Sequence, residues 1–151
     1  MTEIHIHPAT ESDASTLATI FTTSFTTDLD RAMFPPTPAV HDWWTRVFTA
    51  DITRTSGTRV FKAVDDTTGE VAGYALWALP GSAHAGDDEM PPFPADCDAE
   101  LCKRFFGAMD GVMEVVMGGE KEFYCLFFIF FISLSLSPLL SLNFVLLHSL
   151  F

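Results

Sequence analysis

The chain has 151 residues, the length of a single domain of common size. Its net charge of −12, from 20 acidic and 8 basic residues, repels nucleic-acid phosphates and anionic lipid surfaces. No run rich in Lys or Arg interrupts this acidic balance, so the sequence argues against a nucleic-acid partner. Three cysteines, and an N-terminus without the basic and apolar regions of a secretory signal, predict a cytoplasmic protein.

The first elements are a strand and a helix. In residues 3–7 the isoleucines Ile4 and Ile6 alternate with histidines, which predicts a short strand with one buried face. Thr10, three residues before Asp13, approximates a capping box at a helix start. Apolar residues at helical spacing follow it, and they predict an amphipathic helix over residues 11–25.

A polar and then proline-rich connection is expected over residues 26–37. Thr37 followed by Pro38 favours a helix start, because proline suits the first helical position. One apolar stripe then predicts a second helix over residues 38–52, formed by Val40, Trp44, Val47 and Phe48.

An antiparallel hairpin is the clearest local pattern. Residues 58–64 and 70–79 are typical of strands, and the turn sequence of residues 65–69 lies between them. Gly73 within the second strand indicates a bulge or a close backbone contact.

Residues 80–95 are rich in Pro, Gly and acidic side chains and predict a long loop. A third helix is expected over residues 96–117, with a glycine pair at 118–119 to end it. An apolar segment then begins at residue 123 in the manner of a strand. The order of the elements predicts a mixed α/β domain that contains an antiparallel hairpin.

Three segments resemble the N-terminal part of the GNAT superfamily of N-acetyltransferases, particularly its fungal members. They are IHPATESDASTLATIFTTSF, TRVFKAVDDTTGEVAGYALWALP and FFGAMDGVMEVVMGGEKEFY, and the resemblance covers about residues 3–124. It implies an incomplete GNAT-type acyl-CoA N-acyltransferase fold, with a mixed sheet and flanking helices. It also implies acetyl-CoA as cofactor, and a small-molecule or peptide amine as acceptor of the acetyl group.

The resembling family binds the pyrophosphate of acetyl-CoA at a glycine-rich turn after its fourth strand, where backbone N–H groups approach the phosphates. No glycine follows Gly119 in this chain, so no cofactor-binding or catalytic residue can be carried over from the family. We therefore expect weak acetyl-transfer activity or none. Carboxylates near the expected active-site strand are candidates for a general base, namely Glu114, Glu120 and Glu122. The acidic run 87–89 could attract a cationic amine.

Residues 125–151 have a different composition from residues 1–124. Leu, Phe, Ser and Pro make up 21 of these 27 residues, and none of the 27 is charged. Pyrimidine-rich DNA read in frame gives this composition, so we interpret 125–151 as a hydrophobic tail translated from an intron or created by a gene-model error. Two alternatives stay open. In the first, the tail is a membrane anchor, for which it is long enough, and the chain is a tail-anchored protein with an acidic cytosolic domain. In the second, residues 123–132 supply a buried fourth strand. A chain without activity would be a non-enzymatic remnant.

The remaining candidates are individual side chains. Phe34 and Trp43 are candidates for the acceptor site, because the first two helices of the resembling family flank that site. Trp44 lies on the core stripe and is expected to pack inside, whereas Trp43 points elsewhere. His5 and His7 could present two imidazoles on one strand face, but the sequence assigns them no acidic partner, so no metal site is expected.

Overall fold

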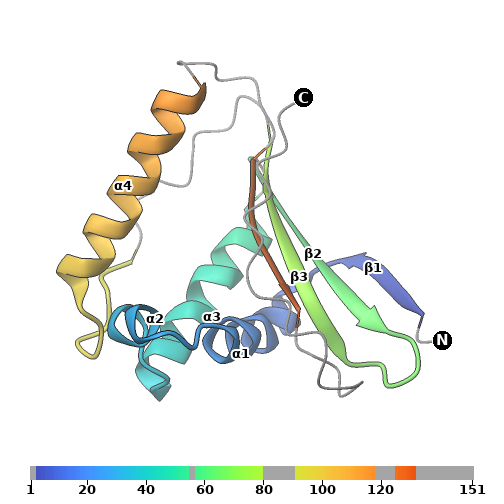
Figure 1. The fold of residues 1–151 in the computed structure, drawn as a ribbon. Helices are drawn as coiled ribbons and strands as arrows, with labels where there is room; N and C mark the ends of the chain where they lie inside the picture. Colours follow the sequence, from blue (N-terminus) through green and yellow to red (C-terminus); the bar gives the residue numbers. More distant parts are fainter. Residues whose placement is uncertain (1–2, 55–56, 80–90, 118–124, 132–151) are drawn as a thin grey trace.

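The computed structural model describes residues 3–54, 57–79, 91–117 and 125–131. A four-stranded sheet has the order β1 (Ile4–Pro8), β2 (Thr58–Asp65), β3 (Val71–Ala78) and β4 (Cys125–Phe131), and every pair of neighbouring strands is antiparallel. Helices α1 (Ala14–Ser24) and α3 (Pro38–Thr53) pack on one face of the sheet, and the first turns of α4 (Ala99–Met117) contact the rest of the molecule (Figure 1). The fold is therefore mixed α/β with an antiparallel hairpin, in agreement with the fold class expected from the sequence.

The first strand, β1 (Ile4–Pro8), lies at the edge of the sheet and pairs with β2 (Thr58–Asp65). All of its residues are exposed, and the side chain of Ile6 is 64% exposed. The prediction that Ile4 and Ile6 form a buried face is wrong. Ile6 pairs with Ala63, whereas the core residue Val60 points to the opposite face of β2, where the helices lie.

The predicted helix over residues 11–25 is confirmed as two consecutive elements, the short 3-10 turn η1 (Glu11–Asp13) and helix α1 (Ala14–Ser24). The predicted capping contact is present, since the backbone N–H of Thr10 donates to Asp13 Oδ2 over 2.8 Å. Lys62 Nζ on β2 donates to both oxygens of that carboxylate, over 2.7 and 2.8 Å. Burial would raise the pKa of Asp13, but the hydrogen bonds from Lys62 and Thr10 hold it below its ordinary value. This ion pair joins the helix start to the sheet.

A short helix, α2 (Asp28–Met33), lies where the sequence predicted only a connection. Its start is a capping box: Thr27 Oγ1 accepts from the N–H of Asp30, and the Asp30 carboxylate accepts from the N–H of Thr27. The prediction was wrong because six residues are too few to show a helical period, although the capping pair itself was visible in the sequence.

Helix α3 (Pro38–Thr53) confirms the predicted second helix. Its N-cap is Thr37, whose hydroxyl accepts from the N–H of Val40, and Pro38 occupies the first helical position.

The predicted hairpin is confirmed as β2 and β3 (Val71–Ala78). In the turn, the N–H of Gly69 donates to the carbonyl of Asp65, and Gly69 has a φ of 72°, a conformation that favours glycine. Ala63 pairs with Gly73 and Val64 pairs with Val71, so one residue of β3 is left over between them. The predicted bulge at Gly73 is thereby confirmed.

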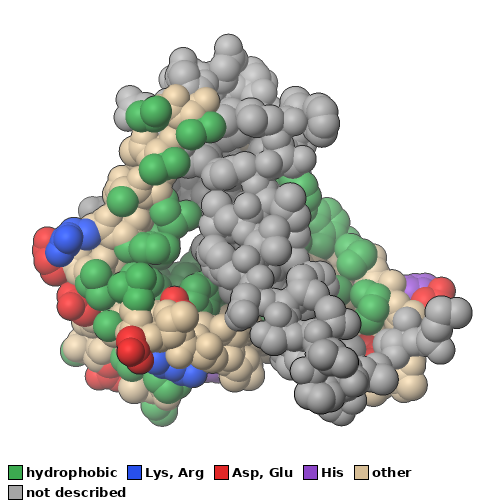
Figure 2. Space-filling view, viewed as in Figure 1, with side chains coloured by type: hydrophobic (Ala, Val, Ile, Leu, Met, Phe, Trp, Pro, Cys, Tyr) green, Lys and Arg blue, Asp and Glu red, His purple; other side chains and the backbone are tan. Residues whose placement is uncertain are grey.

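Helix α4 (Ala99–Met117) begins three residues later than predicted, because residues 94–98 form a turn before it. The carboxylate of Asp98 accepts from the N–H of Leu101, and the N–H of Asp98 donates to the carbonyl of Ala32 at the end of α2. These bonds fix the first turn of α4 against α2. Further along the helix, Val112, Val115 and Val116 are exposed, and hydrophobic side chains follow α4 in Figure 2.

The last described element is strand β4 (Cys125–Phe131), which pairs with β3 from Ala78↔Cys125 to Gly73↔Phe131. The sheet thus continues past residue 124, where the sequence analysis placed the start of the hydrophobic tail. For these seven residues the structure agrees with the alternative interpretation, a fourth strand. Residues 132–151 lie outside the described residues, and none of the described helices has the length and apolar character that crossing a membrane requires.

Candidate functional site

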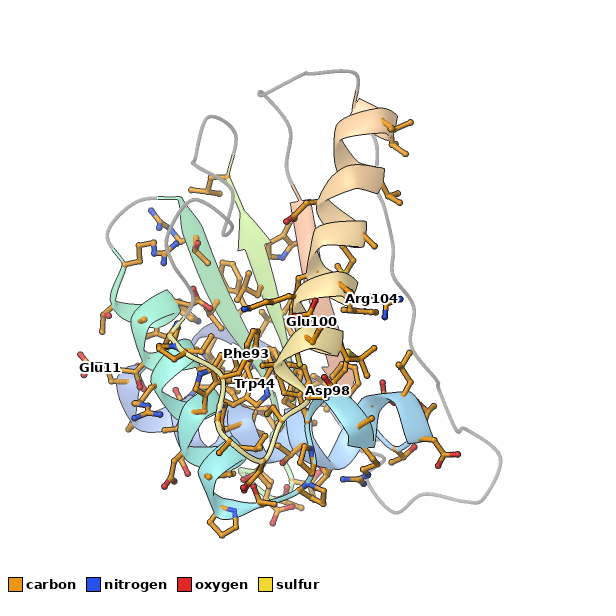
Figure 3. The ribbon with its side chains drawn as sticks, turned by 90° about the vertical axis from the view of Figure 1, so that its left-hand side faces the viewer. Glu11, Trp44, Phe93, Asp98, Glu100 and Arg104 are labelled. Carbon is orange, nitrogen blue, oxygen red and sulfur yellow. The ribbon has the colours of Figure 1, made fainter. Side chains whose placement is uncertain are left out.

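An aromatic cluster fills the space where the helices meet the sheet and the segment before α4. Figure 3 places Trp44 and Phe93 in this interior, whereas Glu11 and Arg104 lie at the periphery. Rings contact one another throughout the cluster, which contains Phe21, Phe34, Trp43, Trp44, Phe48, Tyr74, Phe93 and Phe106.

The two acceptor-site candidates lie together in this cluster. The rings of Phe34 and Trp43 are stacked, with their centroids 6.0 Å apart. Trp43 is 0% exposed, and its Nε1 donates to the carbonyl oxygens of Pro91 and Pro92 over 3.1 and 2.9 Å. Trp43 thereby attaches the segment before α4 to α3.

Trp44 packs in the core as predicted, but the expectation that Trp43 points away from the core is wrong. Consecutive helical side chains project about 100° apart, so only one of the two lies on the stripe that faces the sheet. The other is buried because Phe93 covers it, with ring centroids 5.3 Å apart. Sequence periodicity carries no information about that segment, which is distant along the chain. An acceptor-side role for Phe34 and Trp43 stays a prediction.

Trp44 places a buried indole N–H group in the cluster. Its ring lies 3.8 Å from that of Phe21, and its Nε1 is buried without a hydrogen-bond partner among the described residues. A buried donor without a partner costs about 1 to 3 kcal/mol. The cluster therefore contains a donor that could bind an acceptor atom, and that otherwise lowers the stability of the fold.

A carboxyl group with a raised pKa, that of Asp51, lies beside the cluster. Asp51 is half-buried in the last turn of α3, and this burial raises its pKa from 3.8 to about 6, although Arg54 acts in the opposite direction. The Tyr74 hydroxyl on β3 is buried, and its pKa is raised well above 10 by burial and by the charge of Asp51. A carboxyl that titrates near neutral pH can accept and release a proton under physiological conditions.

Asp51 was not among the candidates predicted from the sequence. One signal was available, since a carboxylate in the last turn of a helix opposes the helix dipole. Of the carboxylates that were predicted, Glu114 lies in α4, and Glu120, Glu122 and residues 87–89 lie outside the described residues.

Cys97 and Cys102 are unpaired, and Cys102 is buried in α4. Its Sγ donates to the carbonyl of Met33 over 3.5 Å, and burial first, then nearby negative groups, raise its pKa to about 11. A thiol with that pKa is protonated at neutral pH and is a poor nucleophile. Cys102 therefore belongs to the packing between α2 and α4.

The fold of this chain is similar to a solved structure of an acetyltransferase. It is described as histone acetyltransferase HPA2 and related acetyltransferase from Corynebacterium glutamicum ATCC 13032. The two chains are 22% identical, the match covers 80% of this chain and 74% of that one, and the TM-score is 0.37. A likeness at this level assigns no activity to the present chain. No protein-family model matches the sequence, and no curated protein matches it.

Proposed function

We propose that this chain is an N-acetyltransferase-related protein, that its described part forms the acceptor side of the site, and that it holds acetyl-CoA weakly. The observation that carries the proposal is the order and pairing of the elements. A first strand, helices, an antiparallel hairpin, a further helix and a fourth strand beside β3 follow one another. The GNAT resemblance of residues 3–124 implies elements of these kinds in this order.

The proposed reaction is attack of a primary amine on the thioester carbonyl carbon of acetyl-CoA. The nitrogen–carbon bond forms and the carbon–sulfur bond breaks. The amine nitrogen loses one proton, and the leaving sulfur takes up one proton to become the free thiol of CoA. The amine must be unprotonated to attack, so a nearby carboxylate or water has to accept its proton. Phe34 and Trp43 would shape the acceptor side from the interior, as buried supports rather than as contact residues.

Weak cofactor binding is proposed because the sequence after β4 offers no phosphate-binding turn. A pyrophosphate is held best by backbone N–H groups at a glycine-rich turn and a helix N-terminus. The sequence after β4 contains no glycine, and the chain carries a net charge of −12, which repels the phosphates of the cofactor.

Calorimetric titration of acetyl-CoA into the full 151-residue chain tests this weakness. We expect no saturation below about 1 mM, which corresponds to less than about 4 kcal/mol of binding free energy. Saturable binding in the micromolar range would contradict the weak-binding part of the proposal, and it would leave the acetyltransferase class standing.

Sequencing the transcript across the codons for Tyr124 and Cys125 tests whether the protein belongs to the acetyltransferase class. A spliced form that continues from the fourth strand into an Arg/Gln-x-x-Gly-x-Gly/Ala turn supports an acetyltransferase. Detection of the unspliced message alone counts against the class and favours a non-enzymatic remnant.

A further inference from the structure

Three ligand-type side chains converge where β1 meets the β2–β3 turn. His5 Nε2 lies 3.2 Å from Glu3 Oε1 and 3.2 Å from Asp66 Oδ2. One ligand atom from each residue lies within 4.8 Å of the other two. Figure 2 shows histidine and acidic side chains next to each other at the end of the molecule that carries β1.

The two separations from His5 Nε2 suit a metal ion. Zn²⁺ binds imidazole nitrogen and carboxylate oxygen at about 2.0 to 2.2 Å, which places ligand atoms roughly 3 to 4 Å apart. An imidazole with two carboxylates is a nitrogen–oxygen ligand set that divalent transition metals accept. A three-residue set leaves further coordination positions to water.

The backbone holds the three residues in place. The N–H of Asp66 donates to the carbonyl of Glu3 over 3.1 Å, and Ile4 pairs with Asp65 in the strand register. The side chain of Asp65 accepts from the N–H of Thr67 over 2.8 Å, which fixes the turn that carries Asp66. Glu3 and His5 lie two residues apart, so they share one face of the chain. The three ligand side chains are therefore close together before an ion binds, and only their side-chain rotations have to be restricted on binding.

The charges at this place favour a cation. Two carboxylates flank one imidazole, and within the described ranges neither Glu3 nor Asp66 forms an ion pair with Lys or Arg. A divalent ion would neutralise the two carboxylates and relieve their mutual repulsion.

We propose that Glu3, His5 and Asp66 form a surface binding site for a divalent transition-metal ion such as Zn²⁺, which clips the N-terminal strand to the hairpin turn. The ion would connect two segments that are distant in the chain and would hold β1 on the edge of the sheet. The proposal is independent of acetyl transfer. From the sequence, only His7 could be placed on the same strand face as His5, and no acidic partner could be assigned. In the fold, Asp66 in the β2–β3 turn lies beside His5.

The chain contains a matched control in His41. Its imidazole also lies near a carboxylate, with His41 Nδ1 3.8 Å from Asp42 Oδ1, but it has a single acidic neighbour. Its Nε2 is already in contact with Thr19 Oγ1 at 3.1 Å and with the Ser15 carbonyl at 3.2 Å. Replacing His41 removes one histidine from the chain without touching the proposed site.

The test is calorimetric titration of ZnCl₂ into the EDTA-stripped full chain, for the wild type and for His5→Gln, Glu3→Gln, Asp66→Asn and His41→Gln. We expect one saturable site in the wild type and in His41→Gln, and binding weaker by about tenfold or more in the other three variants. Equal affinity in His5→Gln and the wild type, or no saturation in the wild type up to about 1 mM, would overturn the proposal.

A thermal melt separates the clip from a folding defect. In EDTA the wild type and the three site variants should melt together, since Glu3, His5 and Asp66 are exposed and substitutions there have small effects. Zn²⁺ should raise the melting temperature of the wild type and of His41→Gln, because binding to the folded state alone stabilises it. An equal rise in His5→Gln would count against the site.

Discussion

The aromatic cluster and strand β1 differ in burial although both show regular apolar patterns. In helix α1, which contributes Phe21 to the cluster, helical periodicity and burial agree, and Phe21 packs among rings from other elements. In β1 the isoleucines alternate strictly with histidines, yet all five residues of the strand are exposed. A period therefore predicts which side chains share a face, whereas burial depends on whether another element covers that face.

The largest expected effect comes from the cluster. Phe21→Ala removes a ring that contacts Phe34, Trp44 and Phe48, and it should lower the free energy of unfolding by about 3 to 5 kcal/mol. Urea denaturation followed by tryptophan fluorescence measures this, because Trp44 lies 3.8 Å from the replaced ring. A loss below about 1 kcal/mol would mean that the cluster is not the centre of the core, and the comparison with β1 would fail.

The second prediction concerns Asp51 at the margin of the cluster, where the effect on stability depends on pH. The pKa of Asp51 is raised in the folded state to about 6, so its contribution to stability is full below about pH 4 and is lost as the pH rises through 6. Asp51→Asn should therefore stabilise the protein at pH 8, by up to about 3 kcal/mol, and leave it unchanged at pH 4.

The control for Asp51 is Asp42→Asn in the same helix, whose side chain is exposed and should give no pH-dependent gain. Thermal melts of both variants at pH 4 and pH 8 suffice for the measurement. An equal shift in the two variants would show that net charge, rather than burial of Asp51, determines the result.

The smallest effect is expected in β1. Ile6→Thr should change the free energy of unfolding by less than about 0.5 kcal/mol, since Ile6 is already 64% exposed. Val60→Thr is the matched substitution on the buried face, where the side chain is 6% exposed, and it should cost about 1 to 3 kcal/mol. Similar losses in the two variants would mean that the outer face of the sheet is covered in solution.

Much of the fold could be predicted because its signals are local. The capping contact of Thr10 with Asp13, the start of α3 at Pro38 and the bulge at Gly73 each depend on residues close together in the sequence. Helix α2 was missed because its six residues are shorter than a readable period. The segment Cys125–Phe131 was interpreted as part of a translated intron, with a membrane anchor and a fourth strand as alternatives, because an apolar run is compatible with all three.

The candidate sites were harder to predict because they depend on distant pairs. Trp43 is buried by Phe93 and by the carbonyls of Pro91 and Pro92, which lie far along the chain from α3. Asp51 owes its raised pKa to burial beside the sheet, which a helix period does not report.

The kinds and order of most elements, and the hairpin with its bulge, could be predicted from the sequence, and the acidic character of residues 1–122 is a matter of composition. The elements follow from period, capping and turn chemistry, which act over a few residues. The exposure of β1, the burial of Trp43 in the core and the position of Asp66 beside Glu3 and His5 depend instead on the tertiary structure. Those outcomes depend on which elements pack or pair with one another, and packing joins residues that no local pattern connects.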